Sequence, residues 1–458
     1  MNRKNPPSPP VVKKDERPGW VTEIRKYKII TPLYGGGEET QKADSVTTVR
    51  ATEVRGHLRF WWRATRGGLP EFEGKLEKMR EREEQIWGSS AEKDKQGPSQ
   101  VSVFVSVLDQ NKGTPVFKKD VFKKREGRSV PTDIGEPQSP WSYVAFPLRV
   151  EKDEHGRVTK PAGSVLENVE FELKISCPAK LKDEVEVALW AWETFGGIGA
   201  RTRRGFGALQ CVEKVDIVKN TSQKISAPKH NEVNADYIKK HLESGGKWPA
   251  GVPHLSSNLK FVTKVFSGDT IQASIQAWEY VFGKLKNFRQ DRYQGSTSPY
   301  GRSKWPEPDA IRRLPGIPSA AKHRMPRSTI DKFPRGQFGL PIIFKFKDND
   351  DPAVTTLQGR KLDHNKYIDR LASPLIIRPI ACSDGAMGLA VILEWEPVES
   401  DERYTPPGGL WLTSKDYGEF QVESDLDASD AKDIEPLKDV DNGKPQPDVL
   451  QAFLDFLK

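Results

Sequence analysis

Apolar and polar positions alternate along the chain in two patterns, which predict strands and amphipathic helices. Gln100 to Leu108 (QVSVFVSVL) is rich in β-branched residues and is typical of a strand. Between Leu181 and Phe195 the apolar residues recur at helical spacing and form one stripe. This predicted helix ends at Gly196-Gly197, and a strand is expected from Ala208 to Lys219.

The remaining segments of the first half complete a recognisable order of elements. Stripped of insertions, that order is strand, helix, two strands, helix, strand, which is typical of a ferredoxin-like βαββαβ domain. We therefore predict an α+β fold in which two helices cover one face of an antiparallel sheet. The further segments are a strand at Ile24–Thr31, a helix at Thr52–Arg66, a charged helix at Glu71–Trp87, and strand candidates at Tyr143–Val150 and Val169–Ser176.

The second half is predicted to contain a strand and a long helix, then further strands after a loop region. A second ferredoxin-like domain is a hypothesis here, because no clear internal sequence repeat supports it. The elements expected are strands at Leu259–Phe266, Gly339–Phe346, Pro374–Ile380 and Gly388–Trp395, a helix at Thr270–Arg289, and a short final helix that docks on the core through Val449, Leu450, Phe453, Leu454 and Leu457.

Changes in composition divide the chain into domains. The segment between the halves is rich in Lys, Ser, Asn, Pro and Gly, as linkers are. The predicted units are a disordered, Pro-rich leader at 1–19, a first domain at 20–219, a linker at 220–257, and a second domain at 258–458 with a basic insert at 289–336 and an acidic segment at 423–448.

Composition excludes several classes of protein. None of the 458 residues belongs to an apolar run long enough for a membrane helix, and the leader lacks the apolar core of a secretory signal. The three cysteines are far apart, so we expect neither a disulfide framework nor a cysteine zinc site, and a cytoplasmic location fits. The seven histidines show no metal-ligand spacing, and we expect no metal or cofactor.

The formal net charge of +8 is modest for this length, but the basic residues are concentrated. Residues 50–68 carry a net +4, the glycine-rich loop at 196–207 carries +3, and residues 289–335 carry +7, while residues 423–448 carry −6. Concentrated basic charge indicates a polyanionic partner. The acidic segment is either a contact for a partner or a flap that shields the basic segments, and the sequence leaves both open.

Arginines form one stripe on the predicted helix at 52–66, beside an apolar stripe that can face the sheet. Like charges at this spacing repel, and the guanidinium fork suits phosphate oxygens. Trp62 lies at the border and is expected to be part core, part stacking platform. The alternative is a solvated face, or arginines that pair with acidic residues elsewhere in the fold. The arginines are Arg55, Arg59, Arg63 and Arg66, with Arg50 just before the helix.

The loop GGIGARTRRGFG is neither a Walker loop nor a dinucleotide fingerprint, because it lacks Gly-Lys-Ser/Thr and follows a helix instead of a strand. Its glycines, Gly197 and Gly199 among them, are expected to let backbone N–H groups converge on an anion. Arg201, Arg203 and Arg204 would join them. The alternative is a tight helix-to-strand turn with solvated arginines.

Two further features suggest RNA contact or chemistry. In the basic insert, aromatic residues interleave with basic ones and could stack on bases, unless the insert is simply a disordered basic loop. His57, on the predicted helix that carries the arginine stripe, could act as a general acid or base, although a packing role is the alternative. The aromatic residues of the basic insert are Tyr293, Tyr300, Trp305 and Phe333, and its candidate RNA contacts are Arg302, Arg324 and Arg327.

Four segments together resemble a known family. TPLYGGG followed by VRATEVRGHLRFWWRATRGG, and QIWGSS after it, resemble the first subunits of type III-B CRISPR (Cmr) effector complexes. GGIGARTRRGFG resembles the glycine-rich loop of the RAMP superfamily, to which those subunits belong. RLASPLIIRP, from Arg370 to Pro379, is similar to a motif of their second half.

This resemblance implies two RAMP domains and an RNA-guided antiviral complex with other Cmr subunits. It implies a non-catalytic subunit that contacts the 3′ region of the guide crRNA and the paired 5′ region of the target RNA, while other subunits do the chemistry. Two alternatives stay open: a metal-independent RAMP endoribonuclease that uses His57, and a pure protein scaffold. By motif, the RNA-contact role falls on Arg55, Arg59, Arg63, Arg201, Arg203 and Arg204.

Overall fold

A computed structural model gives the arrangement of most of the chain. The predicted leader lies outside the described residues except for its last three. The described residues are 17–36, 44, 47–89, 97–111, 113–117, 122–125, 128–131, 140–153, 155, 157–217, 219–242, 246–256, 259–294, 301–314, 328–346, 352–361, 366–394, 406, 408–415, 417–439 and 442–457.

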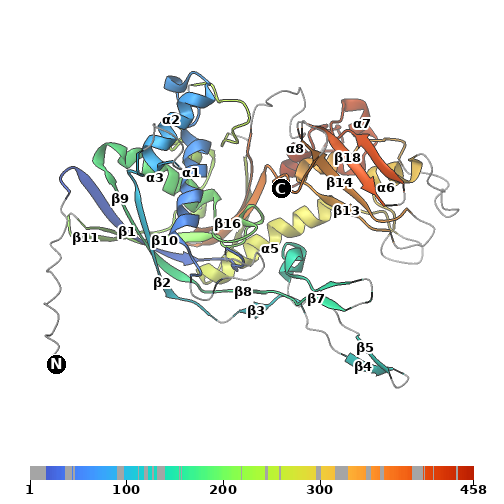
Figure 1. Cartoon of the computed structure of the whole chain (residues 1–458), viewed down its shortest axis with the longest axis horizontal. Coiled ribbons are helices and arrows are strands. Elements are labelled where there is room, and N and C mark those ends of the chain that lie inside the picture. Colours follow the sequence, from blue (N-terminus) through green and yellow to red (C-terminus); the bar gives the residue numbers. More distant parts are fainter. Residues whose placement is uncertain are drawn as a thin grey trace, which may run out of the picture.

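The first half forms a five-stranded antiparallel sheet in the spatial order β11, β10, β1, β9, β2 (Figure 1). Without β11 and the insertions, the chain runs strand, helix, two strands, helix, strand, which is the predicted order. The elements are β1 (Trp20–Ile29), α1 (Ala51–Arg66), α2 (Leu76–Trp87), β2 (Ser102–Asp109), β9 (Glu170–Pro178), α3 (Lys182–Phe195), β10 (Leu209–Asp216) and β11 (Thr221–Lys224).

One face of this sheet is covered by α1 and α3, which pack against each other (Figure 1). Along β9, Phe171, Leu173 and Ile175 are buried and alternate with more exposed residues. The strand's period of two therefore places the apolar side chains under the helices. Val54, Leu58 and Trp61 of α1 are buried in the same core, as the predicted apolar stripe requires.

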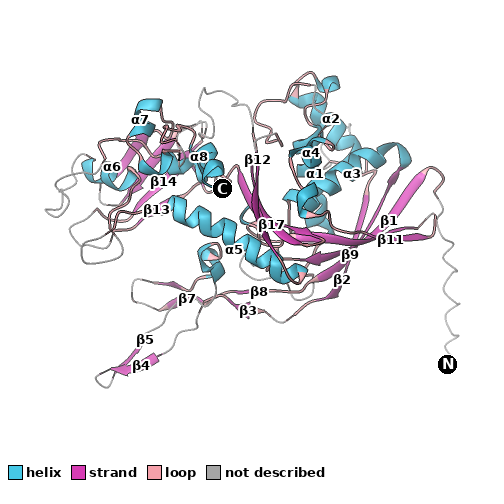
Figure 2. Ribbon diagram, turned by 180° about the vertical axis from the view of Figure 1, so that it is seen from behind, coloured by secondary structure: helices cyan, strands magenta, loops and turns pink. Residues whose placement is uncertain are grey.

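An arm is inserted between β2 and β9 and extends away from the sheet (Figures 1 and 2). The strand expected at Tyr143–Val150 is wrong, because two short 3-10 turns occupy this region, Pro140–Tyr143 and Phe146–Leu148. Pro140 and Pro147 lack the amide hydrogen that a strand ladder needs. The arm's strands pair as β3 (Thr114–Pro115) with β8 (Ser164–Val165), β4 (Phe122–Arg125) with β5 (Arg128–Pro131), and β6 (Glu151–Lys152) with β7 (Val158–Lys160).

The second half contributes a three-stranded sheet in the order β12, β17, β16, and α5 packs on it. Every residue of β16 and β17 is buried. Ile376 and Leu389 belong to the core of the first half, whereas Ile377 and Ala390 belong to a second core with α5. The described residues add no fourth strand to this sheet. The elements are β12 (Leu259–Phe266), α4 (Ala235–Lys239), α5 (Thr270–Arg289), β16 (Leu375–Cys382) and β17 (Gly385–Ile392).

A small lobe at the far end of the molecule carries its own sheet, in the order β13, β14, β18, β19 with β15 beside β14 (Figure 2). The sequence pattern did not predict most of it, because buried positions of β14 hold Thr355 and Gly359, which give no apolar signal. Its elements are α6 (Glu307–Arg313), β13 (Ile342–Phe344), β14 (Thr355–Arg360), β15 (Tyr367–Ile368), β18 (Leu410–Ser414), β19 (Gly418–Val422) and α7 (Ala428–Lys432).

The last helix, α8 (Val449–Phe456), docks on the second core through the predicted apolar residues. Its partners include Phe288 of α5 and Phe338, whose rings lie 5.6 and 6.2 Å from that of Phe453. In the part of the chain that the structure describes, no helix has the length and apolar character needed to cross a bilayer.

Candidate nucleic-acid interface

The glycine-rich loop at 196–207 is a tightly packed turn between α3 and β10. Gly199, Gly205 and Gly207 have φ of +83°, +85° and +61°, which side chains rarely adopt. A Cβ on Gly207 would lie 1.9 Å from the carbonyl oxygen of Ile198. Close packing of the backbone therefore accounts for these glycines.

The expected anion cradle is wrong at Gly199, because acceptors from outside the loop already occupy its backbone N–H group and that of Ala200. The N–H of Gly199 donates to Glu53 Oε1 at 2.6 Å, and that of Ala200 donates to the carbonyl oxygen of Tyr34 at 2.7 Å. A Cβ on Gly197 would meet the carbonyl oxygens of Phe206 and Gly207 within 2.9 Å. Carbonyl oxygens repel an anion, so Gly197 and Gly199 serve packing.

Aromatic side chains of both halves hold the loop at the seam between them. Phe206 is fully buried, and its ring lies 4.9 Å from that of Tyr34 and 4.8 Å from that of Trp278 on α5. Trp278 Nε1 donates to the carbonyl oxygen of Arg204 at 2.7 Å. The second half therefore helps to hold a loop that belongs to the first.

Two arginines of the loop reach across this seam. Arg203 Nη1 donates to the carbonyl oxygen of Ser373, and Arg204 donates to those of Leu375 (2.9 Å) and Phe338 (3.0 Å). The Arg203 guanidinium also lies 5.6 Å from the ring centre of Phe60 on α1. These acceptors are uncharged, so the contacts position the guanidiniums without neutralising them.

Three more arginines join Arg203 and Arg204, and we call the five the arginine cluster. Arg201 Nη1 donates to the carbonyl oxygen of Val144 at 3.0 Å. Arg289, in the last turn of α5, lies 5.4 Å from the ring centre of Phe338, whose carbonyl accepts from Arg204. Arg370 precedes Leu371, which pairs with Leu340 near Phe338. Among the described residues, no carboxylate lies within ion-pair distance of the cluster, which comprises Arg201, Arg203, Arg204, Arg289 and Arg370.

The electrostatics of the cluster reflect this lack of counter-charge. Burial lowers the pKa of Arg201 and Arg203. Burial, together with the nearby charges of Arg289 and Arg201, lowers the pKa of Arg204 to about 9. Keeping these guanidinium groups charged therefore costs free energy, and a bound anion would reduce that cost.

Sequence reasoning did not select Arg289 or Arg370 as site residues. Arg370 opens the RLASPLIIRP segment, which was the signal that could have found it. Arg289 was counted only as the first residue of the basic insert, and its sequence neighbours do not distinguish it.

The stripe on α1 has a different environment. Arg59 Nε donates to Glu83 Oε1 of α2 at 2.7 Å, and Arg63 contacts the same oxygen. Arg55 Nη2 donates to the carbonyl oxygen of Trp87 at 2.6 Å, at the end of α2. For Arg59 and Arg63 the structure therefore shows the alternative, pairing with an acidic residue of the fold, whereas Arg55 contacts only a carbonyl oxygen. We call Arg55, Arg59 and Arg63 the arginine row.

The other predicted residues near α1 are also engaged within the protein. Trp62 has 0% exposure and donates from Nε1 to Glu184, so its expected role as a stacking platform is wrong. Arg66 is 6% exposed and donates to the carbonyl oxygen of His241. Arg50 pairs with Asp44 at 2.8 Å.

The basic insert is largely folded and neutralised where the structure describes it. Arg302 forms an ion pair with Asp309. Trp305 and Phe333 are each 1% exposed, so the expectation that they stack on bases is wrong. Both rings complete apolar cores instead. Tyr300, Arg324 and Arg327 lie outside the described residues.

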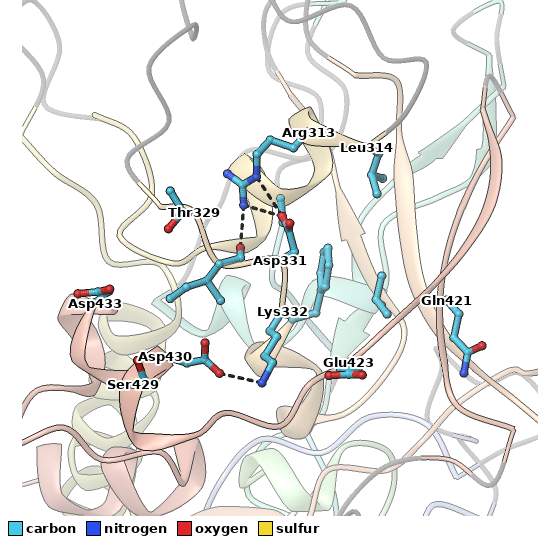
Figure 3. Close-up of a pocket in the computed structure, with 14 residues that line it drawn as sticks. Arg313, Leu314, Thr329, Asp331, Lys332, Gln421, Glu423, Ser429, Asp430 and Asp433 are labelled. Carbon is cyan, nitrogen blue, oxygen red and sulfur yellow. Dashed lines mark hydrogen bonds and ion pairs between the residues drawn. The ribbon is translucent and has the colours of Figure 1, made fainter.

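The acidic segment packs against the end of this insert (Figure 3). Asp430 pairs with Lys332 at 2.7 Å, and the carbonyl oxygen of Glu423 accepts from the N–H of Phe333. Arg313 pairs with Asp331 at 2.6 Å, and both residues line a groove of about 670 Å³ to which the two segments contribute. The Asp430–Lys332 pair shows that the acidic segment compensates one lysine of the same chain.

His57 is placed for packing. Its Nε2 lies 3.6 Å from Glu53 Oε1, and its ring stacks on Trp192 at 6.5 Å. Glu53 in turn accepts from Gly199, so the pair supports the glycine-rich loop. Within the described residues, no group of three or more His, Cys, Asp or Glu side chains is arranged to hold a metal ion.

Comparison with known proteins identifies the class of the first domain. The family model of the RAMP superfamily matches residues 26–210, a span that begins in β1 and ends just after the glycine-rich loop. The chain therefore carries a RAMP domain, and the resemblance found in the sequence is confirmed.

The resemblance to the first subunit of Cmr complexes is confirmed as well. The CRISPR system Cmr subunit Cmr1-1 of Pyrococcus furiosus is 26% identical over 167 residues, which are 36% of this chain and 40% of that protein. The matched segment thus spans two fifths of the curated relative's length.

Two solved structures are also similar. The apo crystal structure of Cmr1 from Pyrococcus furiosus matches with a TM-score of 0.42 and 17% identity, over 84% of this chain and 92% of that chain. A cryo-EM structure of the type III-B Cmr-beta bound to cognate target RNA contains a chain that matches with a TM-score of 0.41 and 14% identity, over 82% of this chain and 94% of that one.

Proposed function

We propose that the protein is a non-catalytic RNA-binding subunit of a cytoplasmic type III-B RNA-guided effector complex. Its partners would be the guide crRNA, the target RNA and other Cmr subunits. It would contact the 3′ region of the guide, the paired target RNA, or both. The observation that carries this proposal is the arginine cluster, five guanidiniums gathered at one seam without a carboxylate partner among the described residues.

The cluster has the chemistry that an RNA backbone requires. Guanidinium groups bind phosphate oxygens in a fork geometry, and phosphate contacts provide much of the affinity of RNA-binding proteins. Carbonyl oxygens fix the direction of Arg203 and Arg204 while leaving their charge uncompensated. An approaching phosphate would therefore meet donors that are already oriented, which lowers the entropic cost of binding.

The domain architecture supports the same proposal. The first half has the complete ferredoxin-like strand order, and β12, α5, β16 and β17 supply the first four elements of a second such unit. The two units share one continuous core, because β16 and β17 contact the core of the first half. A pair of RAMP-type units with a basic seam suits a strand of RNA that crosses both.

The salt dependence of RNA binding tests this proposal. With purified protein and a short single-stranded RNA, about five neutralised phosphates predict that log K falls with log[salt] at a slope near −3.5. A slope shallower than about −1, or no RNA binding by nuclease-treated protein, would overturn the proposal and favour a pure protein scaffold.

Catalysis is tested separately. Labelled RNA incubated with the protein in EDTA should stay intact, because His57 is engaged with Glu53 and Trp192. Cleavage that disappears in His57→Ala would instead assign the protein to metal-independent endoribonucleases. His57→Gln, which keeps a polar side chain beside Glu53, controls for loss of packing.

A further inference from the structure

Tyr34, in the segment TPLYGGG, carries a buried hydroxyl group with no partner. The residue is 1% exposed, and among the described residues its hydroxyl makes no hydrogen bond. Buried polar groups in folded proteins are nearly always paired, so an orphan hydroxyl requires an explanation.

The position of Tyr34 is well determined by its neighbours. Its carbonyl oxygen accepts from the N–H of Ala200 at 2.7 Å, which places it next to Arg201. Its ring packs edge-on against Phe206 at 4.9 Å, inside the core shared with Trp278. The hydroxyl therefore cannot rotate away to reach solvent without disturbing the glycine-rich loop.

The charged groups that act on this hydroxyl are donors, not acceptors. Arg201 and Arg370 both interact electrostatically with Tyr34, and Arg370 is exposed. Burial raises the pKa of Tyr34 to about 12, against the opposing effect of the two arginines, so the hydroxyl keeps its proton at neutral pH. A protonated hydroxyl beside two guanidiniums lacks an acceptor, and an anion would supply one.

We propose that Tyr34, Arg201 and Arg370 form a pocket for one phosphate group of RNA, in which the Tyr34 hydroxyl donates to a non-bridging phosphate oxygen. This inference rests on the proposed function and adds a specific neutral donor to it. The phosphate belongs either to the backbone of the RNA or to one of its ends, since both present the same oxygens.

Tyr34→Phe provides the test, measured as the dissociation constant for a short single-stranded RNA over a series of salt concentrations. The variant should bind about 10- to 100-fold more weakly at every salt concentration, as expected for one lost hydrogen bond to a charged group. Its salt slope should stay that of the wild type, because no charge has been removed. Arg201→Gln should weaken binding and also make the slope shallower by about 0.7.

Tyr237→Phe is the matched control, because this half-buried tyrosine lies on α4 among Trp190 and His241. It should bind RNA as the wild type does. RNAs with a hydroxyl or a phosphate at either end identify the source: an effect of Tyr34→Phe on all of them assigns a backbone phosphate, and an effect limited to one assigns that terminal phosphate.

Three outcomes would overturn the inference while leaving the proposed function intact. The first is that Tyr34→Phe binds RNA with wild-type affinity, and the second is that its salt slope differs from that of the wild type. The third is that the variant unfolds at a lower midpoint than the wild type without RNA, which would reveal a hydrogen-bond partner of the hydroxyl within the protein. Failure of the wild type itself to bind RNA would overturn the proposed function instead.

Discussion

The arginine row on α1 and the arginine cluster at the seam have similar compositions and opposite environments. In the row, Arg59 and Arg63 share one carboxylate, Glu83, which α2 supplies from 20 to 24 residues away in the chain. In the cluster, Arg203 and Arg204 reach carbonyl oxygens of the second half, more than 130 residues away. Glu83 thus compensates part of the charge of the row, through Arg59 and Arg63, whereas the cluster is only oriented by the fold.

The contrast shows that the number of arginines in a segment does not identify a phosphate-binding surface. A carboxylate in contact with a guanidinium already provides the charge that a phosphate would bring, so a phosphate gains little there. A carbonyl oxygen satisfies one N–H and leaves the positive charge in place. The arrangement of acceptors around the guanidinium is therefore the better guide.

Removing the counter-charge of the row should have the largest effect. Glu83→Ala leaves Arg59 and Arg63 adjacent and unpaired beside a buried site, and should lower the free energy of unfolding by about 3 kcal/mol. Urea unfolding measures the loss. Glu81→Ala, at an exposed position of the same helix, should cost less than about 0.5 kcal/mol. Equal losses in the two variants would show that Glu83 does not compensate the row.

Neutralising two arginines of the cluster should have the next largest effect, and it falls on RNA binding. Arg201→Gln combined with Arg370→Gln should weaken binding about 10- to 100-fold and make the salt slope shallower by about 1.4. Arg59→Gln with Arg63→Gln, the two arginines of the row that share Glu83, should change the RNA affinity less than about 3-fold. Filter binding at several salt concentrations compares the two double variants. A greater loss of RNA affinity in the double variant of the row would reverse the assignment of the two regions.

A smaller effect is expected where α5 supports the loop. Trp278→Phe removes the hydrogen bond to the carbonyl oxygen of Arg204 and should lower the free energy of unfolding by about 1 kcal/mol. RNA binding should weaken about 3-fold, because Arg204 and its neighbours lose part of their orientation. Trp411→Phe loses a similar bond to Gly408 in the small lobe and should leave RNA affinity unchanged. An RNA effect in both variants would point to general destabilisation.

The smallest expected effect is on the stability of the RNA-free protein, and it has opposite signs in the cluster and in the row. Arg370→Gln removes one of several like charges from the cluster and should stabilise the RNA-free protein by a few tenths of a kcal/mol. Arg59→Gln breaks its pair with Glu83 and should destabilise it by about 1 kcal/mol. Thermal unfolding without RNA measures the stability of each variant. If both variants were less stable than the wild type, the cluster would hold a counter-charge.

Periodicity predicted the regular elements well where they are long and amphipathic. Strand β12 and helix α5 have the predicted bounds, and α1 and α3 begin within one residue of theirs. The small lobe escaped prediction because its buried strand positions include Thr355 and Gly359. Trp62, Trp305 and Phe333 were assigned to an RNA surface because local spacing cannot tell a border position from a core position.

The order of residues was sufficient to establish the α+β class, the element order of the RAMP domain and the concentration of arginine in few segments. These properties depend on local periodicity and composition, and each can be evaluated from a single segment of the sequence. Packing decided which arginines keep an uncompensated charge, because Glu83, Ser373 and Phe338 reach them from distant parts of the chain. Counter-charge is a property of three-dimensional neighbours, and no pattern within the segments that carry the arginines encodes it.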